Sequence, residues 1–471
     1  MRALFLFVLA IASGVTAAAA DPWAELAEGD VRAMHDALAT NHPGPVDPQN
    51  PGYRDWLESG LKLSVQRAHE AQSLQDYERT LTFYANGFND NHVAVSFHNA
   101  PRFDQWPGFV VGSVDGGVGV VYAEAGAGVA PGAKLLSCDG LDTDALLKAR
   151  TDPYFWRTAV PHQRFERAFH LFYQAADDPQ ATLKTCVFSS GPVALKWQRF
   201  PDSRFQDILA KARGVATRPP SLRQIDGVWI VSIPTFGYQT DEEVTQIRGV
   251  IAAIEKNAPE LRKSTVVFDV RGNGGGNSAW GNAIVKAFWG EAWEQRAEAR
   301  SGGFVVDWRA SPHNLAAVVA AEQQMGKAGL DTAQLQPIIA AIGKALREGK
   351  PLARVVDPSP KIDPAAPLDP VTGRVYFLAD GACSSACLDF ADLMHELPGV
   401  TPIGLPTGAD TNYIDLAFVE LPSGLARFGY GMKVYRDRVR GSNVWYEPKV
   451  RWPGGDMSDD AAIVRWIKSL S

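Results

Sequence analysis

A serine and a run of glycines are the residues of this chain best suited to do chemistry. Ser385 lies in Gly381-Ala382-Cys383-Ser384-Ser385-Ala386, directly after the apolar stretch 374–379 and before a pattern typical of a helix. The apolar stretch 266–270 ends in the same abrupt way, at the glycine-rich segment 271–276. Glycines let backbone N–H groups approach a ligand closely. Hydrolysis by serine needs a hydroxyl, a base and N–H donors for the developing oxyanion, and these two segments indicate the first and the last.

Structural explanations for both segments stay open. Most serines at a helix start only cap the helix, and the glycines could form a simple tight turn. A phosphate loop is excluded because no Gly-Lys-Ser/Thr follows the glycines. Ser385 also lies outside a G-x-S-x-G elbow, which argues against an ordinary α/β-hydrolase.

Together, the glycine-terminated strand and the Ser-Ala pair resemble the C-terminal processing peptidase and tricorn-core family of serine peptidases, family S41. The resemblance selects Ser385 over Ser384 as the nucleophile, and it assigns the oxyanion to the backbone N–H groups of Gly275 and Ala386. It also implies an α/β catalytic domain of crotonase-like topology, a peptide or protein substrate, and chemistry that requires no metal or organic cofactor.

The base separates two branches of this family. Processing peptidases carry a lysine after the nucleophile, but this chain has Asp410 at that place. Tricorn-like members use a histidine from the preceding helical domain and a distant glutamate, and here His92 and Glu447 lie in the similar segments. Histidine suits general base work near neutral pH, and Glu447 would orient the site indirectly. Lys433 is the alternative base.

Two of these assignments have ordinary structural alternatives. His92 could be a structural hydrogen-bonding residue at a domain junction, and Glu447 a surface carboxylate. The match departs from the tricorn-like pattern at Asn91, where those members have a serine, and the expected link between His92 and Glu447 depends on this position. His395 lies ten residues after Ser385 on the same expected helix, which places it about 15 Å along the axis, too far to act as the base.

The elements that must position these residues suggest a multi-domain α/β protein. Residues 21–98 show apolar side chains at helical spacing and predict a small helical N-terminal domain. Residues 105–217 predict short strands and turns, and the stretch 126–140 resembles a PDZ-like module that captures peptides at a sheet edge. A plain β-rich domain is the alternative.

Residues 218–471 alternate strand and helix, as an α/β catalytic domain requires. Thr240 and Glu243 form the pattern of a capping box that opens a helix. Between about 300 and 370 we expect a helical insertion, either a lid over the cleft or a surface decoration, with helices over 315–325 and 335–346.

The first twenty residues have the layout of a signal peptide: Arg2, an apolar core and a small-residue tail that predicts cleavage near Ala20. The apolar core is too short for a permanent span, and no later stretch reaches the length of one. We therefore expect a periplasmic or secreted protein. Loss of Arg2 would change the net charge from −7 to −8, which argues against a nucleic-acid partner. The sequence carries no signal for an oligomeric state.

Four cysteines in an exported chain favour disulfides over a metal site. The simplest of three pairings joins Cys138 with Cys186 and Cys383 with Cys387. For Cys383 and Cys387, two small buried thiols beneath the site are an equal alternative.

The sequence thus predicts an exported serine-type peptidase. One rival is a binding protein that uses the same fold without proteolysis. The other is an acyl hydrolase of the crotonase superfamily, which would share the paired N–H oxyanion site but would need a CoA pocket, of which the sequence shows no sign.

Overall fold

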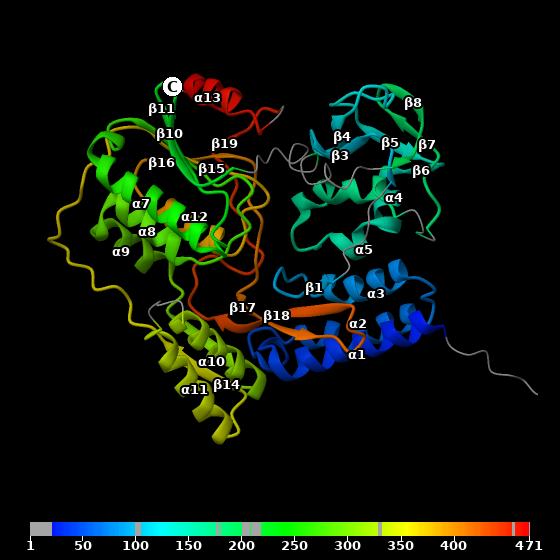
Figure 1. The fold of residues 1–471 in the computed structure, drawn as a ribbon, viewed down its shortest axis with the longest axis horizontal. Coiled ribbons are helices and arrows are strands. Elements are labelled where there is room, and N and C mark those ends of the chain that lie inside the picture. The colour runs from blue at the N-terminus through cyan, green and yellow to red at the C-terminus, as the bar shows by residue number, and fades with distance from the viewer. Residues whose placement is uncertain are drawn as a thin grey trace, which may run out of the picture.

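The computed structural model describes residues 21–98, 105–175, 178, 180–199, 208, 218–327, 332–454 and 457–470. The predicted signal peptide, residues 1–20, lies outside the described residues. The chain forms a mixed α/β protein of several parts, as expected: an α/β part, a β-rich part and a set of N-terminal helices (Figure 1). Within the described residues, no helix combines the length and the apolar character needed to cross a membrane.

The α/β part contains a six-stranded sheet in the order β10-β11-β12-β15-β16-β19. Only β10 is antiparallel to its neighbour, and the other pairs are parallel. The central strands are apolar without interruption because both faces of a parallel sheet are covered. The bounds of the six strands are β10 (Ser221–Ile225), β11 (Val228–Ser232), β12 (Thr265–Asp269), β15 (Val375–Ala379), β16 (Val400–Gly404) and β19 (Val450–Arg451).

Successive residues of β12 belong to two different cores. Phe268 packs with the helices α7 (Asp241–Leu261), α8 (Ala279–Trp289) and α12 (Ala386–Glu396), whereas Val267 packs on the other face with α13 (Asp460–Ser469). Helix α9 (Glu291–Ser301) joins the first group. The predicted capping box at the start of α7 is confirmed, since the Thr240 and Glu243 side chains bond each other's backbone N–H groups.

A second core joins segments that are far apart in the sequence. It contains the N-terminal helices, a five-stranded sheet in the order β1-β18-β13-β14 with β17 paired to β18, and the helices α10 and α11. The bounds are α1 (Pro22–Asn41), α2 (Tyr53–Ala68), α3 (Leu74–Asn86), β1 (Ala94–Phe97), β13 (Val305–Arg309), α10 (Pro312–Lys327), α11 (Leu335–Arg347), β14 (Leu352–Val356), β17 (Tyr413–Glu420) and β18 (Ala426–Tyr435), with the short 3-10 helix η1 (Gly44–Val46).

This second core differs from the domain organisation that the sequence suggests. The two expected helices of the insertion are present, but strands β13 and β14 flank them and pair with each other. Val306 and Ile342 are buried in the same hydrophobic cluster as side chains of α1–α3. The segment 305–356 therefore belongs to the core that supports the N-terminal helices, which is a different role from either a lid or a surface decoration.

The β-rich part spans residues 105–199, and the Cys138–Cys186 disulfide joins its strands β5 and β7. The Cys138 and Cys186 side chains are fully buried in the core of this part. Its bounds are β2 (Gln105–Trp106), β3 (Phe109–Val114), β4 (Gly117–Ala123), β5 (Leu135–Cys138), β6 (Leu141–Asp142), α4 (Thr143–Arg150), α5 (Asp152–Phe155), η2 (Pro161–Gln163), η3 (Phe165–Phe172), β7 (Thr185–Phe188), β8 (Gly191–Ala194) and β9 (Gln198–Arg199).

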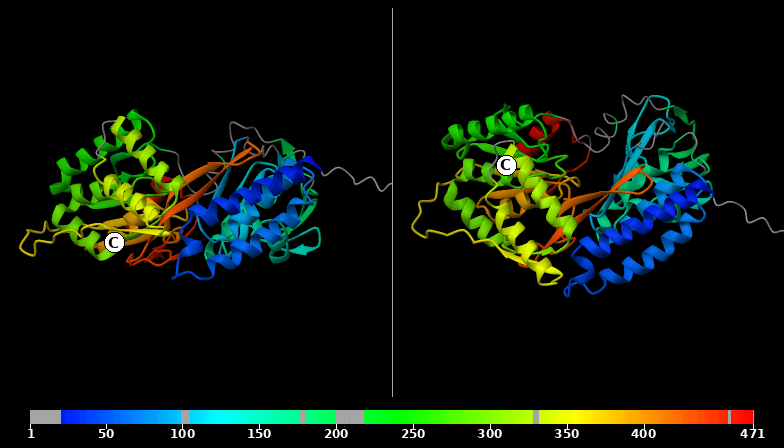
Figure 2. Two further views of the ribbon diagram at one scale, coloured as in Figure 1. Left: turned by 90° about the horizontal axis from the view of Figure 1, so that it is seen from below. Right: turned by 60° about the horizontal axis from the view of Figure 1, so that its bottom comes forward.

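Long strands connect the two sides of the molecule. Strands β17 and β18, drawn in orange, reach from the α/β part to the N-terminal helices (Figure 2). There β18 pairs with β1 over Ala94–Phe97. The pairing of β1 with β18 fixes the segment before β1 relative to the α/β part.

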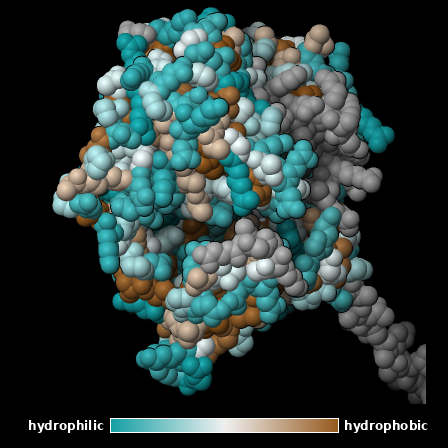
Figure 3. All heavy atoms as spheres, turned by 60° about the vertical axis from the view of Figure 1, so that its left-hand side comes forward, coloured by the Kyte–Doolittle hydropathy of each residue, from teal (hydrophilic) through white to brown (hydrophobic). Residues whose placement is uncertain are grey.

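The face that carries helices of the α/β part is largely hydrophilic, with small hydrophobic patches between them (Figure 3).

Candidate active site

The two predicted motifs meet at one edge of the parallel sheet. Strands β12 and β15 are neighbours in parallel register, so the loops that follow them emerge side by side. Gly275 lies directly against Ser385: a Cβ atom placed on the glycine would lie 2.6 Å from Cβ of Ser385 and 2.7 Å from the carbonyl oxygen of Ser384. Only glycine fits there, and its φ of +102° is one that favours glycine.

Ser385 has the backbone conformation of a constrained residue. It is the residue before α12, with φ 55° and ψ −128°, and its side chain makes no capping hydrogen bond. The simple capping explanation therefore does not account for this serine. Non-glycine residues with such backbone angles persist only where the surroundings impose them, and they concentrate at functional sites.

Two contacts hold Ser385 in this conformation. The Cys383–Cys387 disulfide brackets it and joins the loop to the first turn of α12. The Ser385 N–H donates to Oδ2 of Asp410, a fully buried carboxylate. Asp410, which stands where processing peptidases have their lysine, is therefore a support for the nucleophile loop.

His92 reaches Ser385 from the N-terminal side of the molecule. Its Nε2 atom lies 3.5 Å from Oγ of Ser385, although 293 residues separate the two in sequence. The turn that carries His92 is held from two directions: Oδ1 of Asn89 accepts hydrogen bonds from Thr158 and Ala159, and the Asn89 carbonyl accepts one from Asn443. The structure thus brings the predicted base and nucleophile within reach of a hydrogen bond.

Lys433 and His395 lie in other surroundings. The Nζ of Lys433 pairs with Asp415 at 2.8 Å and lies over the rings of Trp308 and Tyr435. Burial works against its charge, but Asp415 and Tyr435 together outweigh this and raise the pKa of Lys433, the opposite of what a general base needs. The imidazole of His395 stacks on Tyr446, with ring centres 3.9 Å apart.

Glu447 lies on the same side of the molecule as the nucleophile loop, but both of its oxygens have other partners. Trp445 donates to Oε1 at 2.9 Å, and Arg451 donates to Oε2 at 3.2 Å. The adjacent Tyr446 accepts the Thr407 N–H on its carbonyl and donates its own N–H to Oγ1 of Thr407, in the loop after β16. The structure therefore places Glu447 beside the site without a contact to His92.

The proposed oxyanion donors differ in their present partners. The Gly275 N–H donates to Oδ1 of Asn273 at 2.9 Å, and the Asn273 side chain is itself held by the Ile233 carbonyl. The N–H of Ala386 belongs to the first turn of α12, where N–H groups have no partner within the helix. Asn273 lies inside the glycine motif, yet the pattern alone gave no reason to single it out.

Asp380 fastens the glycine loop to the nucleophile loop. One of its oxygens accepts the N–H of Gly272 at 3.0 Å, and the other accepts that of Ala382 at 3.0 Å. The carboxyl group is buried, and this burial raises its pKa to about 6 despite the two N–H donors and nearby Arg271. The relative position of Gly275 and Ser385 therefore depends on one buried titratable group.

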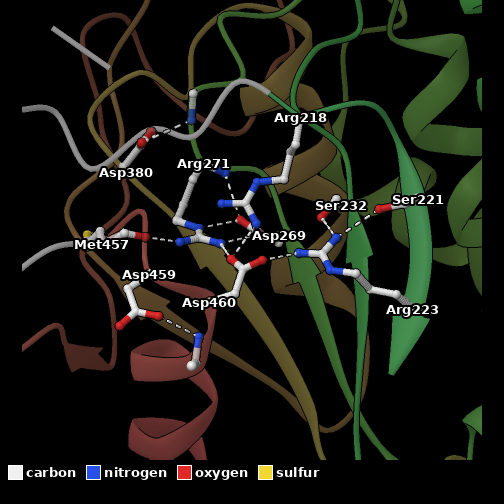
Figure 4. A network of polar contacts seen from close by, with 12 residues as sticks. Arg218, Ser221, Arg223, Ser232, Asp269, Arg271, Asp380, Met457, Asp459 and Asp460 are labelled. Carbon is white, nitrogen blue, oxygen red and sulfur yellow. Dashed lines mark hydrogen bonds and ion pairs between the residues drawn. The ribbon is translucent and has the colours of Figure 1, made fainter. Parts of the chain in front are cut away.

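An ion-pair network anchors the other end of the glycine loop (Figure 4). Arg271 donates to both oxygens of Asp269 and, at 2.8 Å, to Asp460 at the start of α13. Arg218 and Arg223 also donate to Asp460. Although partial burial works against the charge, Arg218 and Arg271 hold the pKa of Asp460 well below its usual range. The network ties the C-terminal helix to the strand that leads into the site.

A pocket of about 390 Å³ lies beside the nucleophile loop. Strand β3, the 157–167 segment and the loops after β15 and β16 form its wall. It carries more basic than acidic side chains, and Nη1 of Arg157 has no hydrogen-bond partner among the described residues. Its polar and charged lining includes Asn91, Arg157, His162, Gln163, Glu166, Arg167, Asp380, Ser384 and Arg451.

The pocket wall is attached by hydrogen bonds to the loops that follow β15 and β16. His162 bonds the carbonyl of Thr407 through Nε2 at 2.9 Å, and Gln163 donates to the carbonyl of Gly381 at 3.2 Å. The β-rich part therefore contributes directly to the surface around Ser385.

Comparisons with known proteins agree with this architecture. No family model and no curated protein matches the sequence. A structure of mature CPAF complexed with lactacystin matches with a TM-score of 0.60 and 14% identity, covering 95% of this chain and 98% of that chain. A crystal structure of mature CPAF matches with a TM-score of 0.62, also at 14% identity, over 95% and 97% of the two chains.

A weaker match is a putative S41 protease from Bacteroides fragilis, with 12% identity, 93% and 97% coverage and a TM-score of 0.34, too low to carry an argument. The CPAF structures match over nearly the whole length of both chains, so this chain has the CPAF fold. At 14% identity, the likeness to CPAF is one of fold.

Proposed function

We propose that this protein is a serine-type peptidase that hydrolyses peptide bonds with Ser385 as nucleophile and His92 as general base. The observation that carries the proposal is the 3.5 Å approach of His92 Nε2 to Ser385 Oγ. In this chain Gly275 also lies directly against Ser385. The chain as a whole has the fold of CPAF. Hydrogen bonds of catalytic residues are often long before substrate binds.

In the first step, Oγ of Ser385 attacks the peptide carbonyl carbon while its proton passes to Nε2 of His92. The carbonyl π electrons move to oxygen, and the N–H groups of Gly275 and Ala386 stabilise the resulting oxyanion. For this, the Gly275 N–H would exchange Oδ1 of Asn273 for the oxyanion. His92 then gives its proton to the leaving amine, and a water molecule hydrolyses the acyl-enzyme by the same route.

The substrate would lie in the pocket beside the nucleophile loop. We propose a PDZ-like role for the β-rich part, which would present an extended peptide along β3, and a crotonase-like topology for the α/β part. The arginines of the pocket favour a substrate that brings a carboxylate close to the cleavage site. Glu447 would act indirectly, because its hydrogen bond holds Arg451 at the rim of this pocket.

Export to the periplasm or the outside of the cell is part of the proposal. The protein has two disulfides, and disulfides persist in oxidising compartments. The predicted signal peptide, residues 1–20, would supply the leader that export requires. Comparison of the N-terminal residue of the mature protein with the predicted cleavage near Ala20 would test this point.

A fluorophosphonate probe tests the activity. The probe should label the wild-type protein and leave Ser385→Ala unlabelled, whereas Ser384→Ala, changed at the neighbouring hydroxyl, should still be labelled. His92→Gln should slow labelling by roughly a hundred- to ten-thousandfold. Ser385-independent labelling, or none, would favour the alternative of a binding protein on the same fold. Cleavage of acyl esters but not of peptides would favour an acyl hydrolase.

A further inference from the structure

Three polar atoms behind His92 are buried and lack hydrogen-bond partners among the described residues. They are Nδ1 of His92, Oδ2 of Asp90 and Nε2 of His42. These residues are exposed by only 4%, 3% and 0%. Burying one polar group without a partner is costly, and three adjacent ones are unusual in a folded protein. Together with Ser385 they form one continuous row.

The distances along this row are short. Nδ1 of His92 lies 3.7 Å from Oδ1 of Asp90, and Oδ2 of Asp90 lies 3.8 Å from Nε2 of His42. The same Oδ1 already accepts the backbone N–H of His92 at 2.8 Å. A closure of less than about 1 Å at each gap would convert both into hydrogen bonds.

The tautomers that such bonds need follow from the other contacts. A base that takes the Ser385 proton on Nε2 must carry its own hydrogen on Nδ1, which then points toward Asp90. His42 accepts the N–H of Gly44 on Nδ1 at 2.9 Å, so its hydrogen lies on Nε2 and also points toward Asp90. Asp90 therefore faces a donor on each side.

We propose that Asp90 is the positioning residue that orients His92 for catalysis, and that His42 in turn fixes the Asp90 carboxylate. The inference rests on the proposed function. It adds a carboxylate that the resemblance did not supply, since Glu447 bonds to Trp445 and Arg451. Asp90 would stabilise the imidazolium that forms when His92 takes the proton, and it would hold the ring in the productive tautomer.

The surroundings of the row suit this role. His42 is stacked on Tyr53, with ring centres 4.7 Å apart and an interplanar angle of 11°, so its ring is fixed. Burial keeps His42 neutral by lowering its pKa to about 3. Burial also raises the pKa of Asp90, against the opposing effects of His92 and Thr411. A carboxylate in such a place gains most when a positive charge appears beside it.

Several titratable groups surround the Asp90 carboxylate. His92 and Arg157 favour its ionised form, while the phenols of Tyr53 and Tyr413 lie close enough to be affected by it. His42 closes the remaining side. A change at Asp90 would therefore be expected to alter the pH dependence of the site as well as its geometry.

The test compares rates of Ser385 labelling by a fluorophosphonate, and the hydrolysis of a peptide, across pH. Asp90→Asn keeps the size of the side chain but removes the charge, and it should slow labelling by roughly a hundred- to ten-thousandfold. It should affect kcat more than KM and move the acid limb of the pH profile to lower pH, because the anion that favours a protonated base is gone. The matched control is Asp30→Asn, another fully buried carboxylate of the N-terminal part.

Two changes at His42 separate positioning from packing. His42→Gln can keep a donor near the position of Nε2, whereas His42→Asn can keep only the acceptor for Gly44. We expect His42→Asn to slow the reaction, and His42→Gln to restore most of the wild-type rate. Thermal melts and near-ultraviolet circular dichroism would establish that the variants are folded.

The outcomes distinguish the two proposals. If the wild-type protein shows no Ser385-dependent labelling, the proposed function fails and this inference fails with it. If the wild type is labelled but Asp90→Asn keeps the wild-type rate and pH profile, only the positioning role is overturned. Equal losses in Asp90→Asn and Asp30→Asn, with an unchanged pH profile, would also overturn it, because they would indicate general destabilisation.

Discussion

Gly275 and Ser385 touch so closely that the glycine has no room for a side chain. The Cβ that alanine would add lies 2.6 Å from Cβ of Ser385, a distance at which one of the two loops must move. Both loops are tied down, one by Asp380 and the other by Asp410. Ser385 can therefore occupy its position only because Gly275 has no Cβ atom.

Gly275→Ala should consequently displace the nucleophile. We expect it to reduce the rate of Ser385 labelling by about a hundredfold or more, the scale of a lost oxyanion donor. The positive φ should add a cost of about 1–2 kcal/mol to folding. Gly274→Ala is the matched control, because a Cβ at Gly274 would meet nothing within 4 Å. Equal rates for the two variants would contradict the role of this contact.

The buried Asp380 should make the stability of the protein depend on pH between about 4 and 6. Its pKa is raised to about 6, so the folded state favours the protonated form. The stabilisation from this group is therefore complete below pH 3.8 and is lost as the pH rises through 6. Urea unfolding of the wild type and Asp380→Asn should show a stability difference that changes by about 3 kcal/mol across this window. A difference independent of pH would contradict the prediction.

Asp460 should behave in the opposite way. Its pKa is held below the usual value, so its contribution is present above pH 3.8 and is lost as the pH falls further. Asp460→Asn leaves buried Arg271 with one carboxylate fewer and should destabilise the protein by roughly 2 kcal/mol at neutral pH. The loss should shrink in acid. Asp459→Asn, which keeps a good helix cap one residue away, should change stability by only a few tenths of a kcal/mol.

The arginines of the pocket should select substrates. Arg167 lines the pocket without belonging to the row of Ser385, His92 and Asp90. Arg167→Ala should raise KM about tenfold for peptides with an acidic residue near the cleaved bond, the effect of one charge-assisted hydrogen bond, and leave kcat nearly unchanged. Matched peptides with glutamine at that position should be cleaved equally by both proteins. A rise in KM for both peptides would argue against recognition of a carboxylate.

The parts of the site that sequence predicts well are those that depend on local pattern. Ser385 and Gly275 each follow an apolar strand directly, and the parallel pairing of β12 with β15 brings the two loops together. His92 could be placed only through a family resemblance, because its contact with Ser385 spans 293 residues. No local pattern relates the end of α1 to the turn after α3, so His42 could not be connected with Asp90.

The second core could not be predicted either, because it also depends on contacts between segments that are far apart in the sequence. The helices between 312 and 347 have clear helical patterns, and the sequence predicts them correctly. Their assignment to an insertion missed β13 and β14, because whether a short segment forms a strand depends on the strand with which it pairs. The partner of β1 is β18, and only the folded chain brings these two together.

The separation of Ser385 and His92 has a consequence for the cell that makes this protein. The two halves of the reactive pair come from opposite ends of the chain, and they meet only after β1 has paired with β18. A nascent chain, a truncated product or a partly folded export intermediate would thus carry a serine without its base. Completion of folding would then be the step that assembles the proposed site.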